Sequence, residues 1–386
     1  MADVPEITLS RLNDLAPDDY QIIDIRDEYA YEYGHIPGAL NVPMDTLQER
    51  AKGFSKEKLL ILCCKSGSIS LDAAEKLCEE GCNAANLSGG YYGWLRINLG
   101  NEDKSKKAEQ SIRKTFHKEL WSRFAKAIRT YQLVQEGDKI AVCISGGKDS
   151  MLMAKLFQEL ARHKKFPFEL VFLVMDPGYS PENREIIEKD AQALDIPITV
   201  FESNIFDSVF NVEKSPCYLC ARMRRGYLYS KAKELGCNKI ALGHHYDDVI
   251  ETILMGMLYG GQVQTMMPKL RSTNFPGMEL IRPMYLIREA DIIRWRNYND
   301  LHFIQCACRF TDTCSVQGGN TGSKRAEIKQ LIAQMKKVNP QVETNIFRSV
   351  EKVNLSTVIG YKDKEGLHSF LDTYDNSEFG MRNSEL

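Results

Sequence analysis

Residues 139–156 read KIAVCISGGKDSMLMAKL, an apolar run that leads through a glycine turn into a helical pattern. The run predicts a β-strand, and the apolar spacing after the turn predicts a helix. In such a unit the turn amides and the positive end of the helix dipole converge where an anion can bind. Glycines let the backbone approach a phosphate, serines add hydroxyls and the lysine adds a cation. The candidate nucleotide-binding residues of this loop are Ser145, Gly146, Gly147, Lys148, Asp149 and Ser150.

The loop matches neither of two common phosphate-binding spacings, GxxxxGK[ST] and GxGxxG. A plain glycine turn in which Asp149 caps the helix is the structural alternative. Because the whole SGGKDS stands between a strand and a helix, we interpret it as a phosphate-binding loop.

The segments around this loop predict an α/β fold. Strand-like runs alternate with helical segments, which is typical of a doubly wound parallel sheet with helices on both faces. The further strand-like runs are 168–176, 196–203 and 238–245, and the helical segments include 150–163, 181–194, 224–236, 289–301 and 323–337.

The first hundred residues predict a separate, smaller α/β unit. Runs at 20–27 and 58–64 predict strands, 68–81 has a helical period, and 84–94 predicts a strand and a turn. The lysine- and arginine-rich stretch that follows repeats apolar residues at helical spacing, so it predicts a linker and an amphipathic helix. The predicted domains are 1–100, 101–131 and 132–361, followed by a disordered tail at 362–386.

Composition narrows the functional classes. With 386 residues and 43% apolar content, the chain can bury more than one core. The net charge of -2 means that any nucleic-acid contact must come from a local patch. No apolar run reaches the ~20 residues needed to cross a bilayer and the N-terminus lacks a signal-peptide layout, so we expect a cytoplasmic protein without membrane association. In that compartment the eleven cysteines are expected to bind metal or act in catalysis.

Two cysteine pairs are candidate metal ligands. Cys217 and Cys220 form CxxC before a predicted helix, and Cys306 and Cys308 form CxC far downstream. Four thiolates would suit structural zinc, and three would suit an iron–sulfur cluster with one iron left open. CxC is poor zinc-ribbon spacing, which favours the cluster over zinc, while a reduced cluster of thiols without metal is the structural alternative.

Polar residues after the strands complete the candidate nucleotide site. Asp149 and Asp248 could hold Mg2+ against the pyrophosphate or orient the attacking group, although a helix N-cap is the alternative for such acids. Further nucleotide-binding candidates are Asp176, Gly243 and His244. Basic residues of 101–131, nine against four acids, and the arginines at 222, 224 and 225 are candidate contacts to an RNA backbone. A solvated helix face is the alternative for the basic linker.

A second loop, in LLILCCKSGSISLDAAEKL at 59–77, places a thiol where the first loop places its glycines. Cys64 is predicted to face the amides of 65–70 and a helix N-terminus, which favours the thiolate. Cys64 is therefore a candidate nucleophile for sulfur, whereas Cys63 is expected to be buried on the strand side.

The SGGKDS loop resembles the pyrophosphatase loop of enzymes that cleave ATP between the α and β phosphates to adenylate a substrate. From about Phe124 to about Tyr361 the chain resembles the tRNA 2-thiocytidine synthetase family, through EGDKIAVCISGGKDS, CYLCARMRRGYLY, LGCNKIALGHHYDDVIETILMGMLYGG, IRPM and PQVETNIF in that family's order. The resemblance implies ATP- and Mg2+-dependent adenylation of the C2 carbonyl of a tRNA cytidine at position 32, and its replacement by sulfur.

The same resemblance implies a [4Fe-4S] cluster held by three cysteines. Cys217 and Cys220 carry over directly. The family has CxxC where this chain has CAC, so both Cys306 and Cys308 are eligible as the third ligand, and we favour Cys308. An open iron can present hydrosulfide to an adenylated carbonyl.

Residues 5 to about 98 resemble single-domain rhodaneses, through DIRDEYAYEYGHIPGALNVP, the CxxGxxS loop from Cys64 to Ser70, and LSGGYYGW. This resemblance implies that Cys64 carries a persulfide. Ile69 stands where members usually have arginine, which should weaken capture of small anions such as thiosulfate, while Lys65 and the amides remain to hold a persulfide from a protein donor.

Together the two resemblances imply a rhodanese-fused tRNA thiolase whose fold class is α/β: a rhodanese-like domain, a linker helix and a doubly wound ATP pyrophosphatase-loop domain. The expected partners are tRNA and a cysteine desulfurase or other persulfide or sulfide donor, and a homodimer is compatible with the sequence. The alternatives are the same chemistry on a tRNA uridine or small metabolite, and a non-catalytic sulfur-relay or sensor protein.

Overall fold

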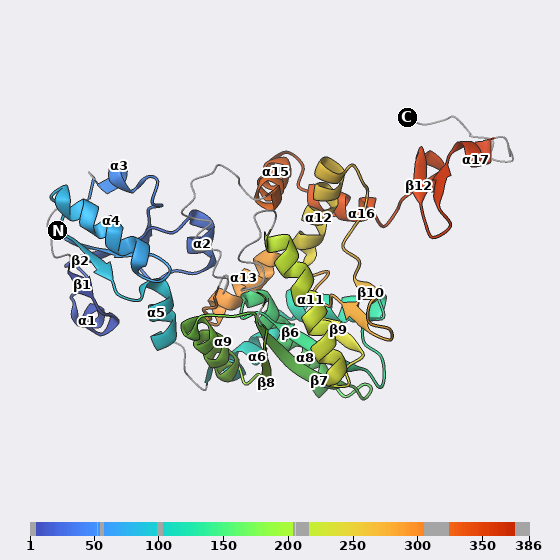
Figure 1. Ribbon diagram of the computed structural model, residues 1–386, viewed down its shortest axis with the longest axis horizontal. Helices are drawn as coiled ribbons and strands as arrows, with labels where there is room; N and C mark the ends of the chain where they lie inside the picture. Colours follow the sequence, from blue (N-terminus) through green and yellow to red (C-terminus); the bar gives the residue numbers. More distant parts are fainter. Residues whose placement is uncertain are drawn as a thin grey trace. The chain divides into compact units, whose positions relative to one another are not determined.

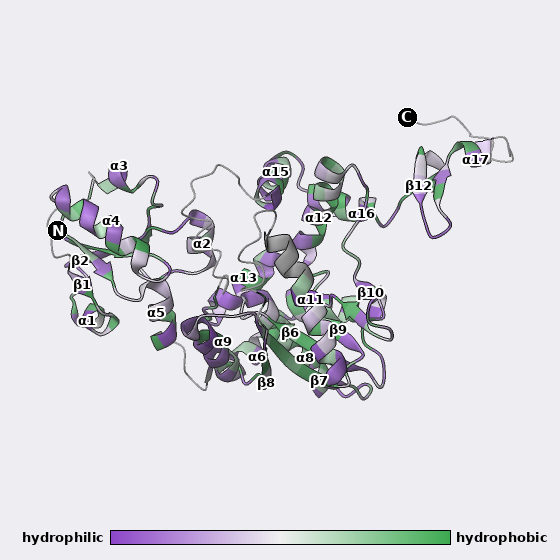
Figure 2. Cartoon of the chain, viewed as in Figure 1, coloured by the Kyte–Doolittle hydropathy of each residue, from purple (hydrophilic) through white to green (hydrophobic). Residues whose placement is uncertain are grey.

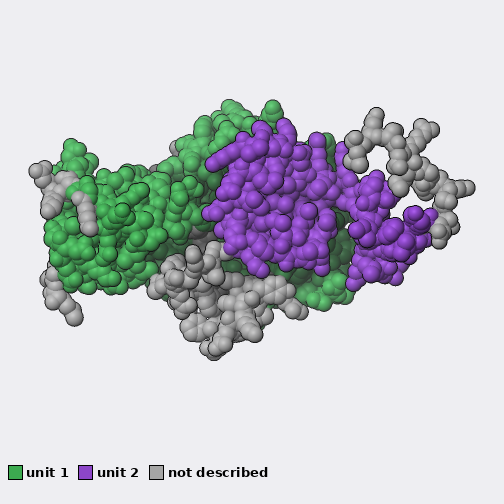
Figure 3. All heavy atoms as spheres, turned by 90° about the horizontal axis from the view of Figure 1, so that it is seen from above, with its two compact units in different colours: residues 1–247, 267–319 green, residues 248–266, 320–386 purple. Residues whose placement is uncertain are grey.

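Two larger sheets, a two-stranded hairpin and a set of helices build the described part of the chain in the computed structural model (Figure 1). The structure describes residues 5–51, 53–54, 58–98, 103–203, 205, 216–304 and 324–374. The chain divides into two units, 1–247 with 267–319 and 248–266 with 320–386 (Figure 3). Among the described residues, no helix combines the length and the apolar character needed to span a bilayer.

The N-terminal sheet has five strands, all parallel, in the order β1-β5-β4-β2-β3. Successive residues of β4 face opposite sides, since Leu60 and Leu62 belong to one apolar cluster and Ile61 and Cys63 to another. The strands are β1 (Glu6–Ile7), β2 (Tyr20–Asp24), β3 (Leu40–Asn41), β4 (Leu59–Cys63) and β5 (Ala84–Leu87), and the helices are α1 (Leu9–Asp14), α2 (Glu28–Tyr33), α3 (Leu47–Ala51), α4 (Ser68–Glu79) and α5 (Gly90–Asn98).

Helix α5 corrects one expectation. The glycine-rich stretch 84–94 predicts a strand and a turn, yet a helix starts at Gly90. Tyr91 and Leu95, one turn apart, are both buried, so packing of one helical face outweighs the turn propensity of the glycines.

The basic connecting segment is helical, as expected. It consists of α6 (Asp103–Arg113), a π-helical turn η1 (His117–Trp121) and α7 (Ser122–Thr130). The apolar residues that predict its buried face are all buried in the structure, namely Ile112, Phe116, Leu120, Phe124 and Ile128.

The second sheet has six strands in the order β10-β11-β9-β6-β7-β8. All pairs are parallel except β10 with β11. Along β6, Val142 faces the apolar cluster that holds residues of α8 and α13, while Cys143 faces the cluster that holds residues of α11, so helices cover both faces. Figure 2 shows the strongly apolar character of this sheet. The strands are β6 (Lys139–Ile144), β7 (Glu169–Asp176), β8 (Ile198–Glu202), β9 (Lys239–Ala241), β10 (Lys269–Arg271) and β11 (Glu279–Ile281), and the helices are α8 (Lys148–Arg162), α9 (Pro181–Ala193), α11 (Pro216–Glu234) and α13 (Glu289–Tyr298).

The strand order places a topological switch point beside β6. The chain runs from β6 to β7 and β8 on one side, and then returns to place β9 on the other side of β6. Ligands of open α/β sheets bind at the carboxyl ends of the two strands that flank such a point. Here those ends lead into SGGKDS and GHHYDD.

Most of α12 (Tyr246–Gly260) belongs to the second unit. The other elements of this unit are α15 (Lys324–Val338), α16 (Val342–Ser349), the 3-10 turn η2 (Leu355–Thr357), β12 (Gly360–Lys362), β13 (Leu367–Ser369) and α17 (Leu371–Tyr374). The predicted disordered tail at 362–386 is therefore wrong at its start, because β12 and β13 pair as an antiparallel hairpin and α17 follows.

Candidate functional site

The SGGKDS loop connects β6 to α8 through a left-handed glycine. Gly146 has φ 84°, and a Cβ there would lie 2.6 Å from Cγ1 of Ile187, so this position requires glycine. The Ser145 amide donates to Ser150 Oγ at 3.1 Å, and Ser150 Oγ donates to the Gly147 carbonyl at 2.9 Å. Gly147 has no side chain to cap α8, and the first amide of the helix, that of Lys148, donates to Tyr33 Oη at 3.0 Å.

Lys148 is almost completely buried and lies between two carboxylates. Its Nζ is 3.1 Å from Asp149 Oδ2 and 3.1 Å from Glu289 Oε1. Burial by itself lowers the pKa of Lys148, but Asp149, Tyr33 and Glu289 raise it above its ordinary value. The lysine therefore stays charged. Glu289, at the start of α13, was missed by sequence reasoning, because nothing in its local pattern marks it as more than a first-turn acid.

The GHH segment after β9 packs on the start of α8, as its position in the sheet predicts. A Cβ on Gly243 would lie 3.3 Å from the Ser150 amide nitrogen, so the two segments touch there. His245 Nε2 lies 4.0 Å from Asp149 Oδ1. Within the described part of the chain, that buried oxygen accepts no hydrogen bond. His244 precedes His245 on this segment and is half-buried.

Two other candidate acids already have protein partners. Asp176 Oδ1 accepts from the amides of Gly178 at 2.8 Å and Tyr179 at 2.6 Å, and thereby shapes the turn after β7. In the second unit, Asp248 Oδ1 lies 2.8 Å from Arg325 Nη1. Neither carboxylate is as open to a ligand as Asp149.

Asp247, the neighbour of Asp248, caps a helix. It lies in α12, but its Oδ2 accepts from the Glu289 amide at 2.7 Å. The carboxylate thus caps the first residue of α13 and not its own helix.

The second loop, from Cys64 to Ser70, holds its sulfur as predicted. The Gly67 amide lies 3.1 Å from Cys64 Sγ, and Ser70 Oγ lies 3.2 Å from it. Gly90 packs directly against the backbone of this loop. Its φ is 57°, and a Cβ there would lie 2.6 Å from the Cys64 carbonyl oxygen and 2.7 Å from the Gly67 nitrogen. Cys64 is only 4% exposed, so a sulfur donor must reach it through local opening.

Cys63 differs from its neighbour as expected. It packs in the apolar cluster on the other side of β4. Burial, with a smaller contribution from Asp24, raises the pKa of the Cys63 thiol well above its ordinary value. Ile69, where rhodaneses have arginine, packs half-buried against the cluster that contains Leu62, and Lys65 Nζ lies 5.3 Å from the centre of the Tyr92 ring.

The candidate metal ligands are only partly within the described residues. The backbone positions of Cys217 and Cys220 lie in the first turn of α11, one helical turn apart. Their side chains, and both Cys306 and Cys308, lie outside the described residues.

The basic residues proposed as RNA contacts differ in their surroundings. Some are engaged within the protein: Arg224 Nη2 donates to Tyr179 Oη at 3.0 Å, Arg113 pairs with Glu159 at 2.8 Å and Arg123 pairs with Asp291 at 2.8 Å. Five others are exposed on the connecting helices, namely Lys106, Lys114, Lys118, Lys126 and Arg129.

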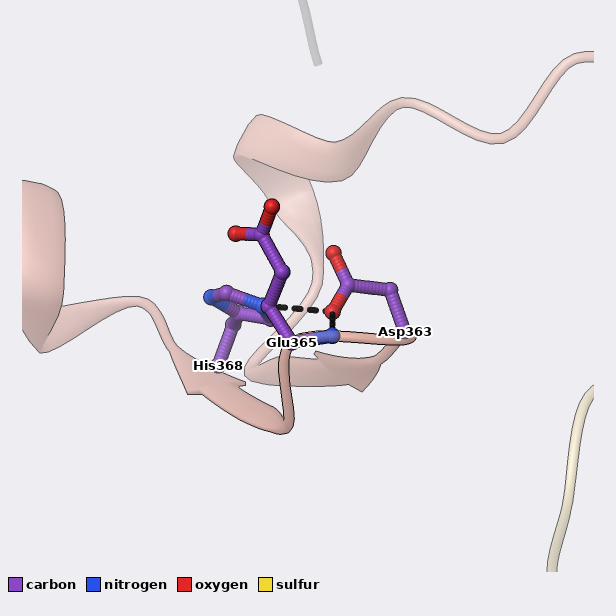
Figure 4. A group of neighbouring side chains, drawn as sticks. All are labelled: Asp363, Glu365 and His368. Carbon is purple, nitrogen blue, oxygen red and sulfur yellow. Dashed lines mark hydrogen bonds and ion pairs between the residues drawn. The ribbon is translucent and has the colours of Figure 1, made fainter.

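One group of potential ligands lies in the β12–β13 hairpin: Asp363, Glu365 and His368 (Figure 4). His368 Nε2 lies 2.9 Å from Asp363 Oδ1, and the same oxygen accepts from the Glu365 amide at 2.7 Å. The histidine and these turn amides lower the pKa of Asp363. The contacts close the hairpin turn, so the cluster is explained without a metal ion.

Comparisons with known proteins agree with this geometry. The family model of the rhodanese-like domain matches residues 8–97, and that of the PP-loop domain matches residues 114–308. The tRNA-cytidine(32) 2-sulfurtransferase of Alkalilimnicola ehrlichii is 35% identical over 265 residues, which covers 67% of this chain and 79% of the relative. The enzyme of the same name from Alcanivorax borkumensis is 38% identical over 241 residues, which covers 61% of this chain and 81% of the relative.

A solved structure that the chain matches is the U34-tRNA thiolase NcsA from Methanococcus maripaludis with its [4Fe-4S] cluster. It is 22% identical, covers 63% of this chain and 80% of that chain, and gives a TM-score of 0.48. The two domain matches confirm the predicted α/β fold class, with a rhodanese-like domain ahead of a PP-loop domain. With relatives at 35–38% identity, the chain belongs to the tRNA-cytidine(32) 2-sulfurtransferase family.

Proposed function

We propose that this protein replaces the C2 oxygen of a tRNA cytidine at position 32 by sulfur that passes through Cys64. Its family makes it an ATP-dependent tRNA sulfurtransferase. The observation that carries the proposal is the meeting of SGGKDS and GHH at the switch point of the sheet, beside the N-terminus of α8. In this proposal, 1–100 delivers sulfur, 101–131 contacts tRNA and 132–361 carries out thiolation.

The SGGKDS loop would bind the phosphates of ATP. The N-terminal amides and the dipole of α8 favour negative charge, and Lys148 is held charged beside them. Asp149 Oδ1 is buried and accepts no hydrogen bond within the described residues, so it fits a ligand position for the Mg2+ that accompanies the phosphates. Asp248, the other acid that the sequence predicts for Mg2+, belongs to the second unit and pairs with Arg325 there.

The adenylation and displacement steps balance without a redox change, whereas release of hydrosulfide from the Cys64 persulfide takes two electrons from a thiol reductant, which is oxidised to a disulfide. The C2 carbonyl oxygen of cytidine attacks the α-phosphorus of ATP, and pyrophosphate leaves. A sulfide then adds to C2, and the C–O bond breaks with AMP as the leaving group. The C2 oxygen becomes part of a good leaving group, AMP, only after adenylation, which explains the use of ATP.

Cys64 is the proposed persulfide carrier. Gly67 N–H and Ser70 Oγ hold its Sγ, and the N-terminus of α4 lies beside it. A cysteine desulfurase or another persulfide donor would load the terminal sulfur. A carrier within the same chain raises the local concentration of sulfur at the PP-loop domain.

Cys217, Cys220 and either Cys308 or Cys306 would hold a [4Fe-4S] cluster. CxxC within the first turn of α11 fits two thiolate ligands of one cluster. Once bound there, a cluster with one open iron supplies a binding position for hydrosulfide.

The function is tested with anaerobically purified protein, ATP, sulfide and unmodified tRNA. We expect release of AMP and pyrophosphate and formation of 2-thiocytidine in tRNA only when all components are present. Thiolation of a uridine or of a small metabolite would instead support the alternative substrates, and nucleotide binding without turnover would support a relay or sensor protein.

The cluster is tested by iron and sulfide analysis of the same preparation. We expect Cys217→Ala to lose both, and Cys82→Ala, a cysteine of the N-terminal domain, to keep both. A colourless protein that contains zinc would refute the cluster.

A further inference from the structure

Tyr33, the last residue of α2 in the rhodanese-like domain, reaches the nucleotide loop. The Lys148 amide donates to Tyr33 Oη at 3.0 Å. A Cβ on Gly147 would lie 3.1 Å from the same oxygen. The hydroxyl thus occupies the position of an acceptor for the first amide of α8, which is the amide that a phosphate oxygen would use.

Cationic groups surround the Tyr33 side chain. Lys148 Nζ lies 5.0 Å from the centre of its ring, and Arg296 Cζ lies 5.7 Å from it. Arg296 is 5% exposed, and its Nη2 donates to the Glu32 carbonyl at 3.3 Å. Its Nη1 makes no hydrogen bond within the described residues. A lysine, an arginine and a helix N-terminus are the groups that bind phosphates, and here they converge on a tyrosine.

Three further contacts hold the rhodanese-like domain against the PP-loop domain. Arg96 of α5 pairs with Glu185 of α9 at 2.6 Å. Lys189 Nζ donates to the Arg96 carbonyl at 3.4 Å, and Trp94 meets His302 edge to face at 5.0 Å between ring centres. Both partners of the Arg96–Glu185 pair are partly exposed, so this contact is weak and can be opened.

We propose that Tyr33 fills the phosphate position of the SGGKDS loop, so that docking of the rhodanese-like domain and binding of a nucleoside triphosphate exclude each other. Nucleotide binding releases α2 from the loop, and departure of pyrophosphate and AMP lets it return. In the docked state the loop holds no nucleotide, and in the undocked state it binds nucleotide and adenylation can proceed. The inference rests on the proposed function in one respect: ATP is the ligand of the loop.

The size of the effect follows from competition. If docking is favourable, the apparent affinity for nucleotide equals the affinity of the undocked state multiplied by the fraction of molecules that are undocked. Tyr33→Phe keeps the ring but removes the only oxygen, which leaves the Lys148 amide without this acceptor in the docked state. We expect the variant to bind nucleotide about 5- to 100-fold more tightly, since an unsatisfied buried donor destabilises the docked state by that factor.

The test is titration of the full chain with a non-hydrolysable α,β-methylene ATP analogue and Mg2+. Tyr31→Phe is the matched control, because Tyr31 lies in the same helix but donates to the Ala39 carbonyl. Its affinity should equal that of the unaltered chain. Arg96→Glu should also tighten binding, and adding Glu185→Arg to it should restore the original affinity.

Hydrogen exchange gives a second readout. Amides of residues 28–33 should exchange faster when the analogue binds, because α2 leaves the loop. Equal affinities for the unaltered chain and Tyr33→Phe, or greater protection of these amides on binding, would overturn the inference. If no variant binds the analogue at all, the proposed function fails instead.

Discussion

Ser70 offers the sharpest test of the proposed sulfur carrier. Its hydroxyl lies 3.2 Å from Cys64 Sγ and 2.8 Å from Asn86 Oδ1, and it has one proton to donate. When the sulfur is a thiolate, the proton turns to the sulfur, because hydrogen bonds to charged groups are the stronger ones. When Cys64 is neutral, Ser70 donates this proton to Asn86 Oδ1. Ser70→Ala therefore removes a hydrogen bond that matters most in the reactive form.

The magnitude is a difference between two hydrogen bonds. A bond to a charged group contributes roughly 1.5–3 kcal/mol, and the neutral bond to Asn86 that is given up contributes about 1 kcal/mol. The net stabilisation of the thiolate is therefore about 1 kcal/mol, so Ser70→Ala should slow persulfide formation about five-fold. Asn86 is buried, and the loss of its partner should also lower the stability of the fold by about 1–3 kcal/mol.

The assay follows sulfur transfer from a cysteine desulfurase to the full chain. Samples are alkylated at intervals, and the peptide 59–65 is analysed by fragmentation, which separates Cys63 from Cys64. Ser68→Ala is the matched control, because Ser68 is exposed and its hydroxyl contacts Ser66 at 3.1 Å. Stability is measured separately by urea unfolding. An unchanged rate for Ser70→Ala, with only the stability reduced, would show that Ser70 is structural and refute its role at the sulfur.

Three further predictions follow from the geometry. Gly90→Ala should abolish persulfide formation in the same assay, because its Cβ would lie 2.6 Å from the Cys64 carbonyl oxygen. Gly38→Ala is the control and should keep it, because Gly38 also has a positive φ, 80°, but a Cβ there would have nothing within 4 Å. Equal rates for the two variants would contradict the loop geometry. Lys155 is wholly buried and pairs with Glu109 at 2.8 Å, so Lys155→Met should lower the free energy of unfolding by about 3 kcal/mol in urea, whereas exposed Lys114→Met should change it by less than about 0.5 kcal/mol. Burial raises the pKa of Glu109, but hydrogen bonds from Arg162 and Lys155 lower it overall from 4.5 to about 2. The ionised Glu109 therefore contributes roughly 2–3 kcal/mol to the free energy of unfolding above pH 4.5, and this contribution is lost as the pH falls toward 2. Glu109→Gln should flatten that part of the stability profile, and an unaltered profile would show that Glu109 does not contribute in this way.

The local units of this fold could be predicted from the sequence because their signals are local. The strand at 139–144 appears where the apolar run predicts it, and the turn after it needs glycine for a positive φ at Gly146. The contrast between Cys64 in its loop and Cys63 in the core follows from strand alternation. Helix α5 was missed because glycine-rich composition favours a turn and the burial that outweighs it is not a local property.

The sequence by itself thus determined the α/β class, the two loops and the chemistry that each can hold, since strand period, turn glycines and helix starts act within a few residues. Only the tertiary structure decided which distant groups meet there. Glu289 reaches Lys148 across 141 residues, and Tyr33 reaches its amide across 115. Such pairs depend on strand order and on the packing of helices and domains, which many sequences satisfy equally well, so no local pattern marks them in advance.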